Sequence, residues 1–279
     1  MRRGKPTRET IPDASCLFVN QLTTILDHVP PALLVIFRFG GLMIYGPVFG
    51  ASVIPVRVKV FLSFILGLAV YPVIYRLHLA GAPLELNLWS LIPMISMELL
   101  IGLILGFLAS LPLVAVQIGG LIMSQQMGLG FARFFNPTID DEAAVLGQIL
   151  FFATLAGFLL IGGHEAMVLA VLHSFQHIPL GGLVPDLNLV ALLTGMLTSA
   201  FELALRVAAP LLALIFLETA AMGFIAKTVP QMNILSLGFP VRILAGLLIV
   251  CLGLVVIDEV VMDGIDETLN LMFEWIETQ

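Results

Sequence analysis

Long apolar stretches alternate with short polar ones along almost the whole chain. A hydrocarbon core about 30 Å thick needs roughly 20 apolar residues in helix, and about six stretches reach or exceed that length. They run near 31–50, 58–76, 91–116, 145–172, 189–226 and 239–262. The pattern therefore predicts an all-α, polytopic membrane protein.

Within this pattern we predict one helical domain over residues 21–262, built from kinked helical hairpins. The fifth stretch is too long for one straight crossing, so Pro210 is expected to kink it or to divide it into a hairpin. Residues 1–20 are interpreted as a polar basic leader, because no apolar core with a cleavage site follows them promptly. Residues 263–279 are interpreted as an acidic C-terminal tail.

Composition supports the membrane class and argues against an enzyme. Hydrophobic residues make up 59% of the chain and charged residues 11%, with a mean hydropathy of +1.09. A soluble domain carries about 25% charged residues. The chain contains no Walker loop, no GxSxG elbow and no dinucleotide fingerprint, so we expect neither enzymatic activity nor a cofactor.

A polar and small-residue face lies inside the third stretch. Glu98, Gly102, Gly106 and Ser110 recur every four residues and therefore share one side of a helix. Small residues allow a second helix to approach closely, and a carboxylate among them is unlikely to face lipid. We interpret this face as a packing seam that contains a hydrogen-bonded Glu98. The alternative is an ion or proton site.

Four further charges lie within the apolar stretches. Glu202 and Arg206 are four residues apart and can neutralise each other as a buried polar pair. Arg38 and Glu218 have no local partner, so each is expected to find an opposite charge elsewhere in the fold. A transport pathway is the alternative to structural pairing.

The histidines do not complete a known metal-binding motif. His164 and Glu165 begin an HExxH pattern, but Val168 occupies the position of the second ligand. His173 and His177 share a helix face without an obvious third ligand. We therefore predict no metal site.

The segment 117–137 differs from the lipid-facing stretches. It reads GGLIMSQQMGLGFARFFNP from Gly119 and is rich in glycine, methionine and phenylalanine. Glycines disfavour regular helix, while Met and Phe supply soft apolar bulk that can repack. We predict a deformable plug loop whose candidate seal residues are Gly119, Gly120, Met123, Gln126, Met127, Gly128, Phe131, Phe134 and Phe135.

The ordered set of motifs around this segment resembles the family of the flagellar biosynthetic protein FliR and its injectisome counterpart, the T subunit of the type III export apparatus. The resemblance covers roughly residues 20–270. Its marks are Pro47, Pro55, Arg57 and Lys59; Glu98, Gly102 and Gly106-Phe107; Gln126-Met127-Gly128 through Pro137; Gly163-His164; Ser174, Pro179 and Gly181; Pro230-Gln231 and Asn233; and Gly238 with Pro240.

This resemblance implies a core subunit of the flagellar protein export gate in the bacterial inner membrane and flagellar basal body. The implied partners are FliP-like and FliQ-like subunits, the B-type (FlhB) and A-type (FlhA) export proteins, and unfolded protein substrates, but not nucleic acid. In the family, the stretch matching residues 119–135 projects into the pore as a plug. The resemblance also implies that much of the core sits above the membrane plane.

Three alternatives remain at this stage. The first is the equivalent injectisome subunit, although the QMG wording and the Phe-rich ending of the segment favour the flagellar system. The second is a small-solute permease in which Glu98, Glu202 and Arg206 bind substrate at mid-membrane. The third, an intramembrane enzyme, lacks a catalytic set.

Overall fold

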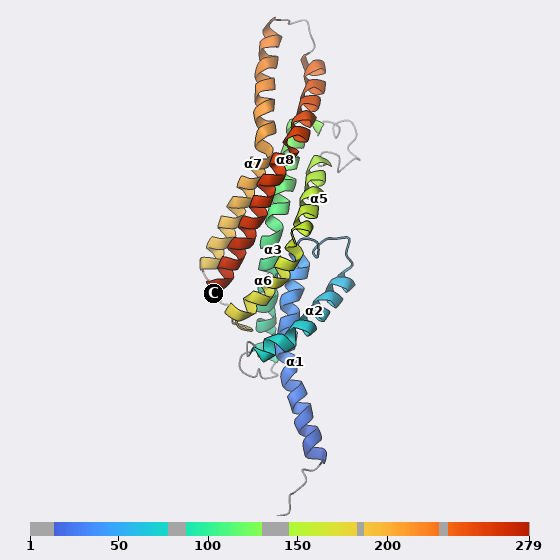
Figure 1. Cartoon of the computed structure of the whole chain (residues 1–279), viewed down its shortest axis with the longest axis vertical. Coiled ribbons are helices and arrows are strands. Elements are labelled where there is room, and N and C mark those ends of the chain that lie inside the picture. The colour runs from blue at the N-terminus through green and yellow to red at the C-terminus, as the bar shows by residue number, and fades with distance from the viewer. Residues whose placement is uncertain (1–13, 78–87, 130–144, 183–186, 229–233, 279) are drawn as a thin grey trace, which may run out of the picture.

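The computed structural model describes residues 14–77, 88–129, 145–182, 187–228 and 234–278. These parts are helical and contain no strand. The helices are α1 (Ala14–Tyr45), α2 (Val56–Arg76), α3 (Leu88–Gln126), α5 (Val145–Leu160), α6 (Gly163–His177), α7 (Leu187–Thr228) and α8 (Ile234–Glu277). Figure 1 shows an elongated bundle in which α7 and α8 project beyond the other helices at one end, and α1 projects at the opposite end.

The core of the bundle is α3, which is the helix most covered by protein. It contacts α1, α5, α6, α7 and α8. Glycines make the closest of these contacts possible. A Cβ on Gly102 would overlap the carbonyl oxygen of Arg38 in α1, and a Cβ on Gly106 would lie 2.8 Å from the backbone nitrogen of Gly46. The two backbones therefore touch along a seam that only glycine permits.

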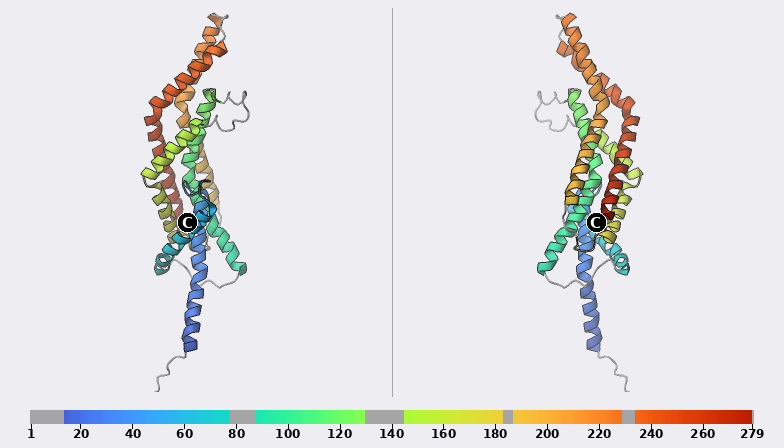
Figure 2. Two further views of the ribbon diagram at one scale, coloured as in Figure 1. Left: turned by 90° about the vertical axis from the view of Figure 1, so that its right-hand side faces the viewer. Right: turned by 90° about the vertical axis from the view of Figure 1, so that its left-hand side faces the viewer.

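The segments α5 and α6 form one broken helical unit. They meet at a bend of 63°, where Gly162 adopts a left-handed backbone with a φ of 78°. A residue with a Cβ is strained in that conformation. The bend lets α5 lie along α3 while α6 turns toward α8 (Figure 2).

The predicted fold class and number of hydrophobic segments are confirmed. Five helices are long and apolar enough to cross a membrane, and the bent α5–α6 pair makes a sixth candidate. Of the two outcomes expected at Pro210, the division of the fifth stretch into a hairpin is wrong, because α7 continues through this proline. A long apolar helix packed against neighbours can absorb one missing backbone hydrogen bond.

Two predicted boundaries also change. Residues 263–277, interpreted as an acidic tail, continue α8 and bury Ile265, Met272 and Ile276 against the bundle. Residues 14–20 of the expected leader already belong to α1, whereas residues 1–13 lie outside the described part of the chain. In residues 263–277, acidic residues on the exposed face of the helix concealed the helical pattern.

Candidate functional site

The most buried polar feature is an ion pair between α1 and α3. Arg38 Nε donates to Glu98 Oε2 at 2.5 Å and Arg38 Nη2 donates to Glu98 Oε1 at 3.1 Å. Both side chains are completely inaccessible to solvent. The bidentate geometry and the absence of water make the pair strong once formed, but costly to break.

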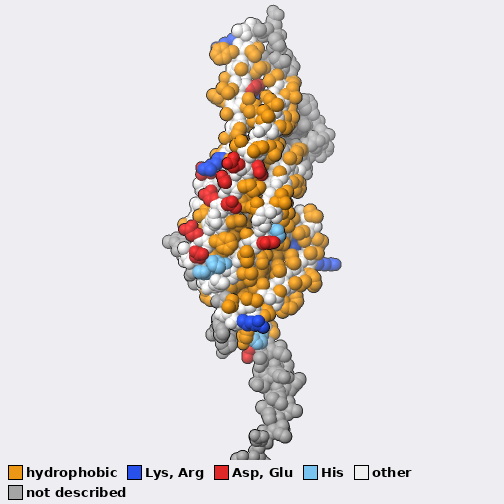
Figure 3. All heavy atoms as spheres, viewed as in Figure 1, with side chains coloured by type: hydrophobic (Ala, Val, Ile, Leu, Met, Phe, Trp, Pro, Cys, Tyr) orange, Lys and Arg blue, Asp and Glu red, His pale blue; other side chains and the backbone are white. Residues whose placement is uncertain are grey.

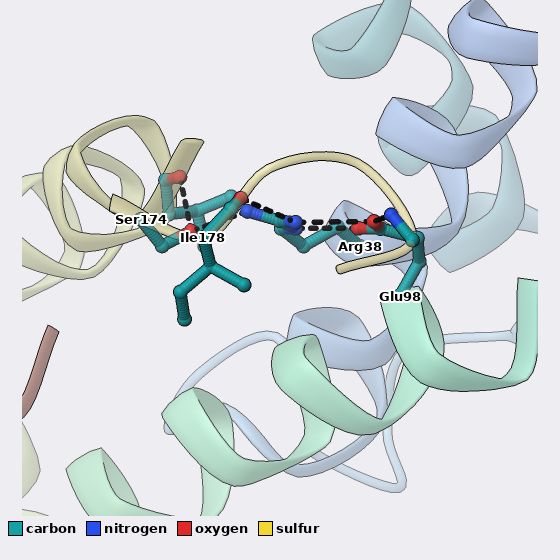
Figure 4. A network of polar contacts seen from close by, with 6 residues as sticks. Arg38, Glu98, Ser174 and Ile178 are labelled. Atoms are coloured by element: carbon teal, nitrogen blue, oxygen red, sulfur yellow. Dashed lines mark hydrogen bonds and ion pairs between the residues drawn. The ribbon is translucent and has the colours of Figure 1, made fainter. Parts of the chain in front are cut away.

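The same two side chains clamp the turn that follows α6 (Figure 4). Arg38 also donates to Ser174 Oγ at 3.0 Å and to the carbonyl oxygen of Ile178 at 3.2 Å. Glu98 Oε1 accepts the backbone N–H of Gly181 at 2.7 Å. The clamp formed by Arg38 and Glu98 therefore binds both the carbonyl and the amide side of one turn.

The surroundings of the clamp are apolar and fully packed. The ring of Phe175 lies 4.1 Å from Arg38 Cζ, which adds a cation–π contact. Ser174 donates its own proton to the carbonyl oxygen of Val171 and so is free to accept from Arg38. Both oxygens of Glu98 accept hydrogen bonds, from Arg38 and from the backbone N–H of Gly181. The arrangement favours a structural role for this carboxylate over an ion site.

A second interhelical ion pair joins α7 to α8. Arg242 Nε and Nη2 donate to Glu218 Oε2 at 3.1 and 2.8 Å, and Nη2 also reaches Thr219 Oγ1 at 3.1 Å. The side chain of Glu218 is only 9% exposed, and its other oxygen is buried without a hydrogen-bond partner. The prediction that Arg38 and Glu218 would find opposite charges is confirmed.

The pair predicted within α7 lies on the surface of the chain. Arg206 Nη2 donates to Glu202 Oε1 at 2.7 Å, but the two side chains are 63% and 60% exposed. Their predicted burial is therefore wrong for this chain. Periodicity places both residues on one helix face but does not say whether another helix of the same chain covers that face.

The first ten residues of the predicted plug are helical. Residues 117–126 form the last turns of α3, and glycine there serves close packing instead of flexibility. A Cβ on Gly119 would lie 2.8 Å from the carbonyl oxygen of Ala204 in α7, and one on Gly120 would lie 2.5 Å from the Cα of Gly147 in α5. Tertiary contacts thus override the low helix propensity of glycine.

The next residues end α3 against α8. Met123 and Met127 are buried, whereas Gln126 is exposed. Gly128 has a φ of 83° and faces the ring of Phe239. The non-helical part of the predicted plug therefore begins at Met127. Phe131, Phe134 and Phe135 lie outside the described residues.

The remaining candidates do not assemble into a metal centre. The rings of His173 and His177 are tilted by 54° with centroids 4.8 Å apart, beside Phe273 of α8. His164 lies 4.0 Å from Glu165 on a partly exposed surface. In the described parts of the chain, no three potential ligands come together.

Sequence reasoning did not predict which residues complete the ion pairs, and it named Ser174 and Gly181 only as marks of the family resemblance. Arg242, Ser174 and Gly181 belong to helices or turns far along the chain from their partners. The one available signal was charge itself, since a lone Arg or Glu in an apolar stretch demands a partner. The local sequence pattern does not indicate which residue is that partner.

These features define a polytopic helical membrane protein held together by buried ion pairs and glycine seams. Residues 29–268 match the family described as bacterial export proteins, family 1. This range includes the clamp, the second ion pair and every interhelical seam described above. The chain belongs to this family of bacterial export proteins.

Individual relatives come from two export systems. The flagellar biosynthetic protein FliR of Bacillus subtilis is 28% identical over 239 residues, covering 84% of this chain and 90% of the relative. FliR of Escherichia coli is 29% identical over 214 residues, covering 76% and 79%. The Yop proteins translocation protein T of Yersinia pestis is 28% identical over 189 residues, covering 66% and 70%.

Proposed function

We propose that this protein is a core subunit of the flagellar type III protein export gate. The observation that carries the proposal is that the match to the export family runs from within α1 to within α8 and so includes α2, α3, α5, α6 and α7 in full. The flagellar relatives are also covered over most of their length. No enzymatic role is proposed, and the fully buried pair Arg38 and Glu98 is engaged in structural contacts.

The surface of the chain supports a place in an assembly. Large apolar side chains of α2, α7 and α8 are exposed, among them Phe61 at 65%, Phe216 at 75% and Leu252 at 73%. Exposed apolar surface on this scale must be covered by lipid or by other subunits. We propose FliP-like and FliQ-like subunits as neighbours, FlhB-type and FlhA-type proteins as further partners, and the bacterial inner membrane as the location.

Within the assembly we propose that the segment after α3 forms the plug. The end of α3 supplies a rigid base, because Gly119 and Gly120 hold it against α7 and α5 and Met127 is buried on α8. The proposed seal residues beyond this base are Phe131, Phe134 and Phe135. Unfolded protein substrates would pass where this segment yields.

A deletion strain tests the function directly. We expect loss of swimming and of flagellar proteins in the culture medium, with both restored by the intact gene and FliP-like and FliQ-like proteins copurifying with the restored chain. The similarity to the Yop translocation protein supports the injectisome alternative, which would be favoured if only virulence substrates were lost. A stable monomer that transports small solutes in liposomes would contradict both readings.

A further inference from the structure

The far end of the α7–α8 hairpin carries a band without unpaired charge. In α7, Glu218 is the only charged residue over 207–226, and in α8, Arg242 is the only one over 234–257. These two residues pair with each other across the hairpin at 2.8 Å. A helix rises about 1.5 Å per residue, so the 20 residues of the α7 segment extend about 30 Å. That length equals the thickness of a bilayer's hydrocarbon core.

Charges bound this band at both ends. Lys227 follows it at the tip of the hairpin, and Arg206 with Glu202 precedes it in α7. At the same level as this pair, α8 begins a series of acidic residues with Asp258, Glu259 and Asp263. Figure 3 shows the acidic side chains gathered on the lower part of the hairpin, below a surface that is largely apolar.

Large apolar side chains of the band are exposed on both helices of the hairpin. Phe224 is 76% exposed on α7 and Val255 is 79% exposed on α8. Polar groups of the band form hydrogen bonds within the hairpin: Thr219 donates to the carbonyl oxygen of Ile215, and Arg242 donates to Glu218. A lipid-facing segment must satisfy its polar groups within itself, whereas a protein-facing one can share them with a neighbour.

The other long apolar helices do not offer such a band. The apolar part of α3 is mostly covered by the chain itself, and α5 with α6 is interrupted by its 63° bend. Both α1 and α2 lie toward the opposite end of the molecule from the tip of the hairpin, as Figures 1 and 2 show. A bilayer that surrounds the tip therefore does not reach them.

We propose that the distal α7–α8 hairpin, residues 207–226 and 234–257, is the bilayer anchor of this chain, with hydrocarbon as its occupant. The acidic residues of α8 from Asp258 to Glu267, here called the acidic belt, mark the membrane boundary. The bundle of α1, α2 and α6 lies outside the hydrocarbon. This inference rests on the proposed membrane-embedded gate and adds to it which part of the subunit meets lipid.

Spin labelling of the assembled complex in membranes tests the anchor. Both cysteines, Cys16 and Cys251, are replaced by Ala, and single cysteines are introduced at Leu244, Leu248 and Leu252, all exposed in the band. Labels there should collide more with oxygen, which dissolves in lipid, than with a water-soluble nickel chelate. A label at Glu267 in the acidic belt is the matched control and should show the opposite ratio.

Each alternative gives a distinct result. Preference for the nickel chelate at Leu248 would place the band in water, and low collision rates with both reagents would mean that partner subunits cover it; either result overturns the anchor. Swimming of each cysteine strain is measured in parallel. Normal export without lipid contact would refute the anchor alone, whereas lipid contact in a protein whose deletion leaves export intact would refute the proposed function alone.

Discussion

Met127, the residue after α3, lies directly on Gly246 of α8, so that a Cβ on this glycine would be 2.6 Å from Met127 Cγ. The contact joins the end of α3, from which the proposed plug emerges, to the first third of α8. Met127 is completely buried in the space left by the missing side chain of Gly246, here called the notch. This contact fixes the position at which the plug segment begins.

Filling this notch should destabilise the subunit. We expect Gly246→Val to lower the unfolding free energy by about 1–3 kcal/mol, because a buried site must shift to accept added volume. Gly253→Val is the matched control on the same helix, since no atom lies within 4 Å of a Cβ placed there. The midpoint of thermal unfolding of the purified complex is measured for both variants. Equal midpoints would show that the Met127 contact accepts the added volume without loss of stability.

The glycine seam between α1 and α3 gives a second matched pair. Gly102→Ala should reduce assembly with partner subunits, because the new Cβ overlaps the Arg38 carbonyl oxygen. Gly40→Ala should assemble normally, since nothing lies within 4 Å of that position. Copurified partner per subunit is the measurement. A normal yield for Gly102→Ala would mean that α1 can move away from α3.

The buried clamp predicts a large difference between two glutamates. Glu98→Gln leaves the Arg38 guanidinium buried without a counter-charge, a change that costs about 3–5 kcal/mol in comparable pairs. Glu202→Gln breaks an exposed pair and should cost about 0–1 kcal/mol. Resistance to urea in detergent reports both changes. Replacing both partners, as Arg38→Met with Glu98→Leu, should recover part of the loss, and its failure would point to a role beyond packing.

The second ion pair allows a parallel comparison within the proposed anchor. Arg242→Leu leaves Glu218 alone in an apolar band, and a charge at the centre of a bilayer costs about 2.5–3.5 kcal/mol on insertion scales. Arg206→Leu removes an exposed partner and should be mild. The amount of protein in washed membranes measures the effect. Equal amounts of the two variants would argue that water reaches Glu218.

The proposed seal is tested by removing aromatic bulk. Phe131→Ala with Phe134→Ala should let membranes leak small ions while the gate still assembles, because large apolar side chains exclude water at roughly 25 cal/mol per Å² of buried surface. Ion leakage in cells that express the whole gate is compared with that of an intact strain. Unchanged leakage in assembled complexes would assign the seal to other subunits.

The helices were predictable because a bilayer-length apolar stretch is a property of local sequence. The clamp was less accessible, since Arg38 and Glu98 are 60 residues apart and charge alone does not select a partner. The expected flexibility at Gly119 and Gly120 did not follow from composition, because these glycines give up backbone freedom to allow close contact with α7 and α5.

The acidic end of α8 was not predicted as part of the helical domain, although its sequence carries a helical pattern. Its charges lie on the exposed face of α8, while Ile265, Met272 and Ile276 recur at spacings of seven and four residues on the buried face. That spacing is a helical signal. Seven acidic residues from 258 onward concealed it, and only packing against the bundle reveals the stripe.

Helix α8 is one continuous helix, so a tilt of the helix displaces residues that lie far from the pivot. It runs for 44 residues, which is about 66 Å of helix, and it contacts α3, α5, α6 and α7 along the way. A tilt of about 5° around Gly246 would displace its far end by about 4 Å, given the rise of a helix. Phe273 lies near that far end, with its ring centroid 6.0 Å from that of His173, so a tilt of this kind would change its position relative to α6.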